Sequence, residues 1–133
     1  MAVTDPVADF LTRIRNGLKA QHRYVDANWS KMKQSIAEIL KKEGFIENYL
    51  VKKDQNERGT IRVFLRYGHG RQPVIRGLKR LSKPGLRKYV KHTEIPCYFG
   101  GLGMSILSTS SGVISGKDAA DNKIGGELLC LVW

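Results

Sequence analysis

The chain has 133 residues, of which 41% are hydrophobic and 26% charged, and its formal net charge is +11. This composition indicates a globular chain of one ordinary domain or two very small ones, and it excludes a disordered or fibrous protein. Its two cysteines lack a Cys-x-x-Cys pairing, which excludes a disulfide framework and a tetrahedral zinc site. The first 20 residues contain acidic and basic side chains and no apolar run, so we expect no signal or transit peptide and a cytoplasmic protein.

Two amphipathic helices and three strands are predicted for the first half of the chain. Phe10, Ile14 and Leu18 recur at the spacing of one helical face. Ser30 is a typical N-cap residue, and it opens a second helix that ends before a glycine. Apolar and polar residues alternate over 60–67 with the period of a strand. In chain order we expect a helix over 6–18, a short strand over 23–28, a helix over 31–43, and strands over 45–53 and 60–67.

The glycine-containing loop over 68–73 is the best candidate for a domain boundary. Beyond it, turn residues separate short runs that favour strands. The predicted fold class is α+β, with an N-terminal α/β domain over 1–72, built from two helices and a small sheet, and a mainly β C-terminal domain over 73–133. The elements expected in the second domain are strands near 77–81, 86–90, 104–108, 113–114 and 127–132, and one short helix over 117–122.

All of the net charge lies in one stretch of the chain. Eleven Lys and Arg residues and no acidic residue occur from Arg58 to Thr93, and the rest of the chain sums to zero. Such segregation predicts a polyanion-binding strip. The uncharged segment over 98–116 is not a membrane span, because Gly, Ser and Thr fill eleven of its 19 positions. We therefore expect a nucleic-acid partner and no membrane.

The sequence contains no recognisable active site. The three histidines have no acidic neighbour to orient them, and no cluster of side chains has the spacing of a metal or cofactor site. We therefore expect no catalysis and no cofactor. Two alternatives remain open, namely a small RNA-acting enzyme that uses Ser110 or Cys97 as its nucleophile, and a non-specific nucleic-acid or membrane binder.

Small hydroxyl side chains gather in one predicted turn, over 105–112. Short hydroxyls and exposed backbone N–H groups can approach a ribose-phosphate backbone closely, and RNA-binding proteins recognise shape, 2′-hydroxyls and unpaired bases. A plain serine-rich turn is the structural alternative. The basic strip contains Tyr89, whose ring could stack on a base, and this favours RNA.

At this turn the sequence resembles the small-subunit ribosomal protein eight family of bacteria and organelles. The signature is Gly103–Ile114, and the further matching blocks are 5–16, 43–46, 78–87 and 125–133. The resemblance implies a structural protein that binds the central domain of small-subunit rRNA at an irregular, bulged helix and aids subunit assembly. It also implies neighbouring small-subunit ribosomal proteins as partners, and the family includes repressors that bind the mRNA of their own operon.

The resemblance also implies where the RNA contacts lie. Tyr89 corresponds to an aromatic residue beside an extruded base, and the start of the second helix corresponds to a backbone contact of the N-terminal domain. The chain differs from the family at Trp29, which replaces a smaller residue, and over 115–121, which lacks the usual basic residues. The expected RNA-binding residues are Ser30, Lys31, Lys83, Arg87, Tyr89, Ser108, Thr109, Ser110, Gly126 and Glu127.

Overall fold

The structure is a computed structural model that describes residues 5–56, 58–96 and 103–133. The chain forms two compact units, which we call the N-terminal unit, Pro6–Arg76, and the C-terminal unit, Gly77–Trp133 together with Asp5. The border predicted after residue 72, as a limit between independently folding domains, stays a prediction. Along the described residues no helix is long and apolar enough to cross a membrane.

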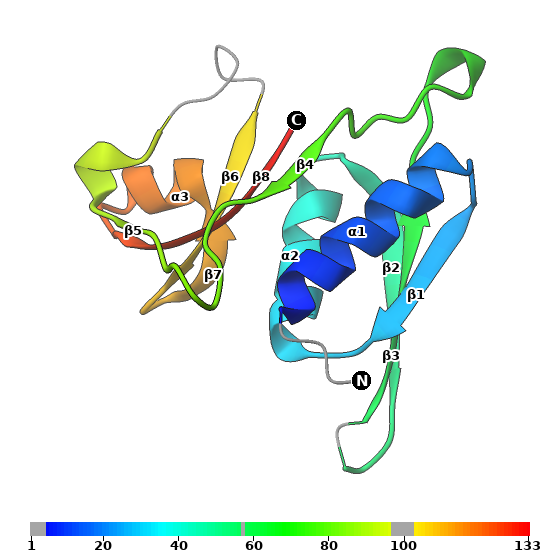
Figure 1. The fold of residues 1–133 in the computed structure, drawn as a ribbon, viewed down its shortest axis with the longest axis horizontal. Helices are drawn as coiled ribbons and strands as arrows, with labels where there is room; N and C mark the ends of the chain where they lie inside the picture. The colour runs from blue at the N-terminus through cyan, green and yellow to red at the C-terminus, as the bar shows by residue number, and fades with distance from the viewer. Residues whose placement is uncertain (1–4, 57, 97–102) are drawn as a thin grey trace. The chain divides into compact units, whose positions relative to one another are not determined.

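The N-terminal unit consists of two helices packed on an antiparallel three-stranded sheet (Figure 1). The strand order is β1-β3-β2, so the last of the three strands along the chain lies in the centre of the sheet. The predicted elements are confirmed with small changes in their ends. They are α1 (Pro6–Lys19), β1 (Tyr24–Asn28), α2 (Lys31–Lys42), β2 (Ile46–Lys53) and β3 (Gly59–Leu65), followed by a single 3-10 turn, η1 (His69–Arg71).

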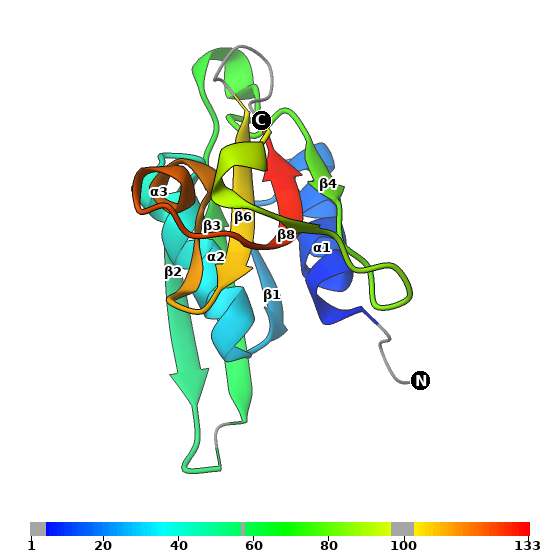
Figure 2. The ribbon, with the colours of Figure 1, turned by 90° about the vertical axis from the view of Figure 1, so that its left-hand side faces the viewer.

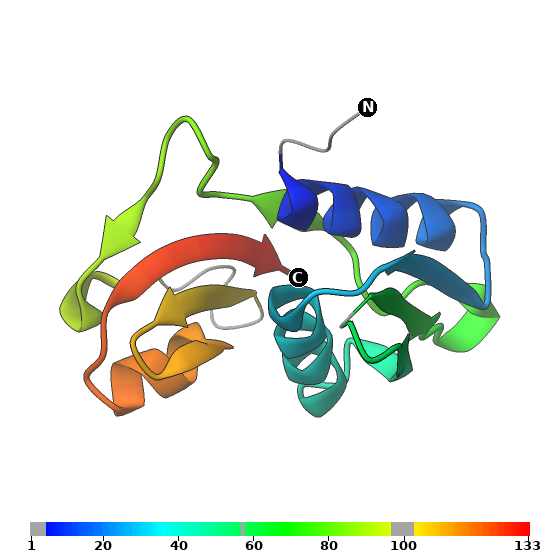
Figure 3. The same ribbon diagram turned by 90° about the horizontal axis from the view of Figure 1, so that it is seen from below.

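Both helices bury one face against this sheet (Figure 3). The apolar stripe of α1 is buried as predicted. On α2 the buried stripe includes Lys33 and Ala37, whereas the expected Met32 and Ile39 are only half-buried. Lys33 is accommodated because its Nζ donates a hydrogen bond to the backbone oxygen of Asn28 at 2.9 Å, while its aliphatic stem packs inward.

The two faces of the sheet differ in character. Ile61 and Val63 of β3 are fully buried and point toward the helices. On the opposite face the Arg62 guanidinium lies 3.9 Å from the centre of the Tyr24 ring and pairs with Asp26 at 2.9 Å. The period-two pattern of β3 therefore separates the core from the outer face, as alternation requires.

The C-terminal unit is a mainly β unit with one short helix (Figure 2). Its antiparallel sheet has the order β4-β8-β6-β7, and β5 pairs with β8 beyond the end of β4. The α+β fold class is thus confirmed. The elements are β4 (Leu78–Arg80), β5 (Tyr89–Val90), the 3-10 turn η2 (His92–Glu94), β6 (Met104–Thr109), β7 (Gly112–Ser115), α3 (Gly116–Asp121) and β8 (Gly126–Val132).

One predicted strand is shorter than expected. The sequence predicts strand over 86–90, but only Tyr89–Val90 pairs with β8. Lys83 and Leu86 instead bond to each other across a tight turn, with N···O distances of 3.0 Å and 2.9 Å. The turn therefore uses the backbone groups that a longer strand would have needed.

Candidate nucleic-acid interface

The sheet of the C-terminal unit brings three predicted site residues side by side. Glu127 on β8 is paired directly with Tyr89 on β5 and with Ser108 on β6. Directly opposed residues in a sheet point to the same face. Residues 19 or more positions apart in the chain therefore form one row, Tyr89–Glu127–Ser108, which we call the cross-strand row. The Tyr89 side chain at one end of it is 70% exposed.

The end of β6 and the turn into β7, residues 108–112, form what we call the hydroxyl turn. Thr109 holds this turn in place through two hydrogen bonds of its side chain. Thr109 Oγ1 donates to the backbone oxygen of Gly112 at 2.8 Å and accepts from the Ser111 amide at 3.1 Å. The φ of Gly112 is +105°, a conformation that favours glycine. Ser108 and Ser110 make no side-chain hydrogen bond to the described part of the chain. The turn thus presents two hydroxyls with unused bonding capacity on a fixed backbone.

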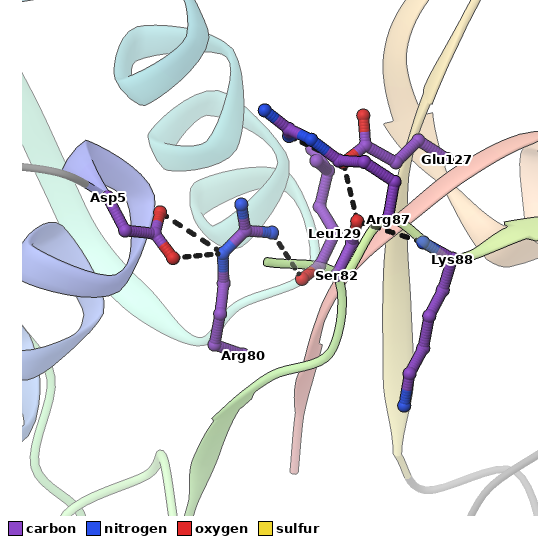
Figure 4. Close-up of polar contacts among 7 residues, drawn as sticks. All are labelled: Asp5, Arg80, Ser82, Arg87, Lys88, Glu127 and Leu129. Atoms are coloured by element: carbon purple, nitrogen blue, oxygen red, sulfur yellow. Dashed lines mark hydrogen bonds and ion pairs between the residues drawn. The ribbon is translucent and has the colours of Figure 1, made fainter. Parts of the chain in front are cut away.

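The carboxylate of Glu127 is engaged inside the protein (Figure 4). Ser82 Oγ donates to Glu127 Oε2 at 2.6 Å, and Arg87 Nη1 donates to the same oxygen at 2.9 Å. Burial opposes ionisation of Glu127, but these two bonds outweigh it and hold its pKa below the ordinary value of 4.5. At neutral pH the residue is therefore an anion that anchors Ser82 and Arg87.

Gly126 allows the backbones of β8 and β6 to approach each other closely and makes no side-chain contact. A Cβ at this position would lie 2.3 Å from the backbone oxygen of Ser108 and 2.9 Å from Thr109 Cγ2. No ordinary side chain tolerates such distances, so only glycine lets β8 approach the end of β6 this closely. The residue therefore sets the spacing of the cross-strand row.

The basic strip seen in the sequence is divided between the two units. Five of its cations belong to the N-terminal unit and six to the C-terminal unit. Some are paired with acids, including Arg62 with Asp26 and Arg80 with Asp5. In the C-terminal unit Lys83, Arg87 and Lys88, before β5, and Lys91, directly after it, are exposed. Of these, Arg87 is also paired with Glu127.

The predicted contact of the N-terminal unit lies at the start of α2. Ser30 Oγ caps this helix by accepting from the Lys33 amide at 3.2 Å, and Lys31 is exposed. Trp29 donates through Nε1 to Gln34 at 2.7 Å, and the Lys53 ammonium lies 4.2 Å from the centre of its ring. Sequence reasoning missed Lys53, since nothing in the linear pattern connects it to Trp29.

Cys130, which was not a candidate nucleophile, lies in the core of the C-terminal unit. The Cys130 thiol is buried, which raises its pKa to about 12 and leaves it protonated. Cys97 lies outside the described residues. The described residues contain no group of three or more His, Cys, Asp or Glu side chains that could hold a metal ion.

Comparison with known proteins shows which family profile and which named relatives the chain is similar to. The profile described as "Ribosomal protein S8" matches residues 5–133. A relative named "Small ribosomal subunit protein uS8" from Protochlamydia amoebophila (strain UWE25) is 71% identical over 133 residues, 100% of both chains. Relatives of the same name are 57% identical over 130 residues in Chlamydia felis, covering 98% of this chain and 97% of theirs, and 55% identical over 133 residues in Leuconostoc mesenteroides, covering 100% of both.

These matches make the chain a ribosomal protein, which is a structural component and not an enzyme. It belongs to the ribosomal protein S8 family, which confirms the resemblance found in the sequence.

Proposed function

We propose that the chain is a structural component of the small ribosomal subunit that binds small-subunit rRNA mainly through its C-terminal unit. The assignment to the small subunit follows from the name that its relatives carry. The resemblance supplies the central domain of the rRNA and its bulged helix as the target, and the cytoplasmic ribosome, with its neighbouring proteins, as the place of action. An mRNA of its own operon that folds into the same shape would bind the same surface.

The observation that carries this proposal is the cross-strand row. It puts an exposed ring, Tyr89, and the hydroxyl turn beside one another, although they are distant in sequence. An aromatic face can stack on an unpaired base, and small hydroxyls can exchange hydrogen bonds with ribose and phosphate. Lys83 and Arg87, in the exposed segment that leads into Tyr89, supply the attraction to phosphates.

The proposal assigns two roles to this surface: basic side chains attract RNA phosphates, and hydroxyl side chains hydrogen-bond to an RNA of matching shape. Ser108 and Ser110 contact the RNA directly through their unused hydroxyls. Thr109 and Gly126 hold the backbone that presents those hydroxyls. Ser30 and Lys31 form a secondary, backbone-only contact from the N-terminal unit, and the charge of Lys31 carries most of it because the Ser30 hydroxyl caps α2.

A salt titration of RNA binding tests this division. The two RNAs are a fragment containing the bulged rRNA helix and the same helix with the bulge fully paired. Neutralising a phosphate contact lowers the slope of log K against log salt by about one unit, so Lys83→Ala should weaken both RNAs similarly. Ser110→Ala should leave that slope unchanged and weaken only the bulged RNA, because an unpaired partner in a close interface costs roughly 1–3 kcal/mol. Equal losses of Ser110→Ala on both RNAs would overturn hydroxyl-based recognition.

A further inference from the structure

Ser82 is a buried polar residue that joins the two ends of an exposed loop. Its side chain is 0% exposed. Its hydroxyl donates to Glu127 Oε2 at 2.6 Å and accepts from the Lys88 amide at 3.1 Å, so it is used both as donor and as acceptor (Figure 4). Sequence reasoning does not single out this serine, because both of its partners are brought to it by the fold.

The backbone on either side of this hydroxyl is anchored to β8. The Ser82 amide donates to the Leu128 oxygen at 3.1 Å, and the Leu128 amide donates to the Lys88 oxygen at 2.8 Å. The segment 83–88 is therefore a loop closed at its base by the Ser82 hydroxyl. Inside it, Lys83 and Leu86 form the tight turn. The loop leads directly into Tyr89, and all of its residues are exposed.

We infer that Ser82 is a positioning residue for RNA recognition. Through its hydrogen bonds to Lys88 and Glu127 it fixes the loop in the unbound protein. The side chains of Lys83, Arg87 and Tyr89 are thereby held in the positions that bind RNA. This inference rests on the proposed function. Glu127 acts in the same way, as the carboxylate that holds Ser82 and Arg87 together. Its own contact with RNA is then not needed for affinity.

The physical reason lies in the entropy of ordering a loop. A free loop of six residues must lose backbone and side-chain freedom when it binds, and that loss reduces affinity. A loop that is already closed loses less. The fully buried hydroxyl is suited to this task because it gives the Lys88 amide an acceptor and shares Glu127 Oε2 with Arg87, so that one side chain links the end of the loop to β8.

The test removes the hydroxyl and compares it with a matched serine. Ser82→Ala deletes both hydrogen bonds. Ser115→Ala deletes another buried serine hydroxyl of the same unit, which caps α3 by accepting from the Asp118 amide at 3.2 Å. We expect Ser82→Ala to lower affinity for the bulged RNA about tenfold and affinity for the paired RNA less than about twofold. Ser115→Ala should reduce stability but keep the ratio between the two RNAs.

Two readouts separate positioning from a general loss of stability. Amide hydrogen exchange of Lys88, measured in the free protein, should accelerate in Ser82→Ala and not in Ser115→Ala. In a Tyr89→Ala background the tenfold loss caused by Ser82→Ala should shrink to about twofold to threefold, since the ring to be positioned is gone. Equal losses with and without the ring would show a merely structural serine.

Glu127 gives a second, independent test should Ser82→Ala fail to fold. Glu127→Gln keeps an acceptor oxygen for Ser82, so we expect less than about a threefold loss on the bulged RNA, whereas Glu127→Ala should match the loss of Ser82→Ala. A tenfold loss for Glu127→Gln would overturn the inference and make the carboxylate itself the RNA contact. If the unaltered chain shows no preference for the bulged RNA, the proposed function fails. If it shows that preference and Ser82→Ala keeps it, the inference alone fails.

Discussion

Gly126 is the position at which the smallest substitution should have the largest effect on the interface. In Gly126→Ala the new Cβ would lie 2.3 Å from the Ser108 backbone oxygen and 3.0 Å from its carbonyl carbon. Non-bonded carbon and oxygen atoms need more than 3 Å, so the ends of β6 and β8 must separate by about 1 Å. The obstruction is backbone and cannot rotate away, as a side chain could.

The expected loss of stability follows from this geometry. Overpacking of a tightly packed site costs about 1–3 kcal/mol, and a backbone obstruction belongs at the upper end of that range. For a unit of this size a loss of about 2–3 kcal/mol lowers the melting temperature by on the order of 10–20 °C. Because the strand ends carry the cross-strand row, affinity for the bulged RNA should fall as well, even at temperatures where the protein stays folded.

The assay is a thermal melt of the full chain together with the binding titration on both RNAs. Gly85→Ala is the matched control, since nothing lies within 4 Å of a Cβ built at that position. It also lies in the exposed loop, where a change from Gly to Ala should alter stability by less than about 1 kcal/mol. If Gly126→Ala melts within about 2 °C of the unaltered chain, the argument from backbone approach is wrong.

Two further predictions concern titratable groups in the C-terminal unit. The folded-state pKa of Glu127 is lowered, so its contribution to stability should be complete above the ordinary value of 4.5 and be lost as pH falls through the lower folded value. The variant Glu127→Gln should therefore remove part of the acid-induced fall in melting temperature, and an unchanged dependence of melting temperature on pH would contradict this. Cys130, whose pKa is raised to about 12, should resist iodoacetamide at pH 8 in a Cys97→Ser chain and react only after denaturation with urea, whereas equal rates in both conditions would refute its burial.

Local patterns were sufficient to predict most of the helices and strands. The apolar stripe of α1 and the alternation in β3 have the periods of a helix and a strand, and each period is a property of the neighbouring residues alone. The errors occurred where one contact overrode the pattern. Lys33 replaced an expected apolar residue on the buried face of α2 because a backbone oxygen satisfies its ammonium. The strand before Val90 shortened because Lys83 and Leu86 close a turn.

In the candidate site, the features that the sequence predicts are clearly separate from those that depend on the tertiary structure. Tyr89 and the hydroxyl turn can be selected from residue type and from resemblance to a family, and net charge alone points to a polyanion. Neither their adjacency nor the role of Ser82 can be derived in this way. Both depend on which residue of β8 lies opposite which residue of β5 and β6, and that register is set by packing between strands far apart in the chain. Properties of single side chains, such as the ring of Tyr89, could be predicted from the sequence. The cross-strand row could not, because it exists only when β5 and β6 pair with β8 in this register.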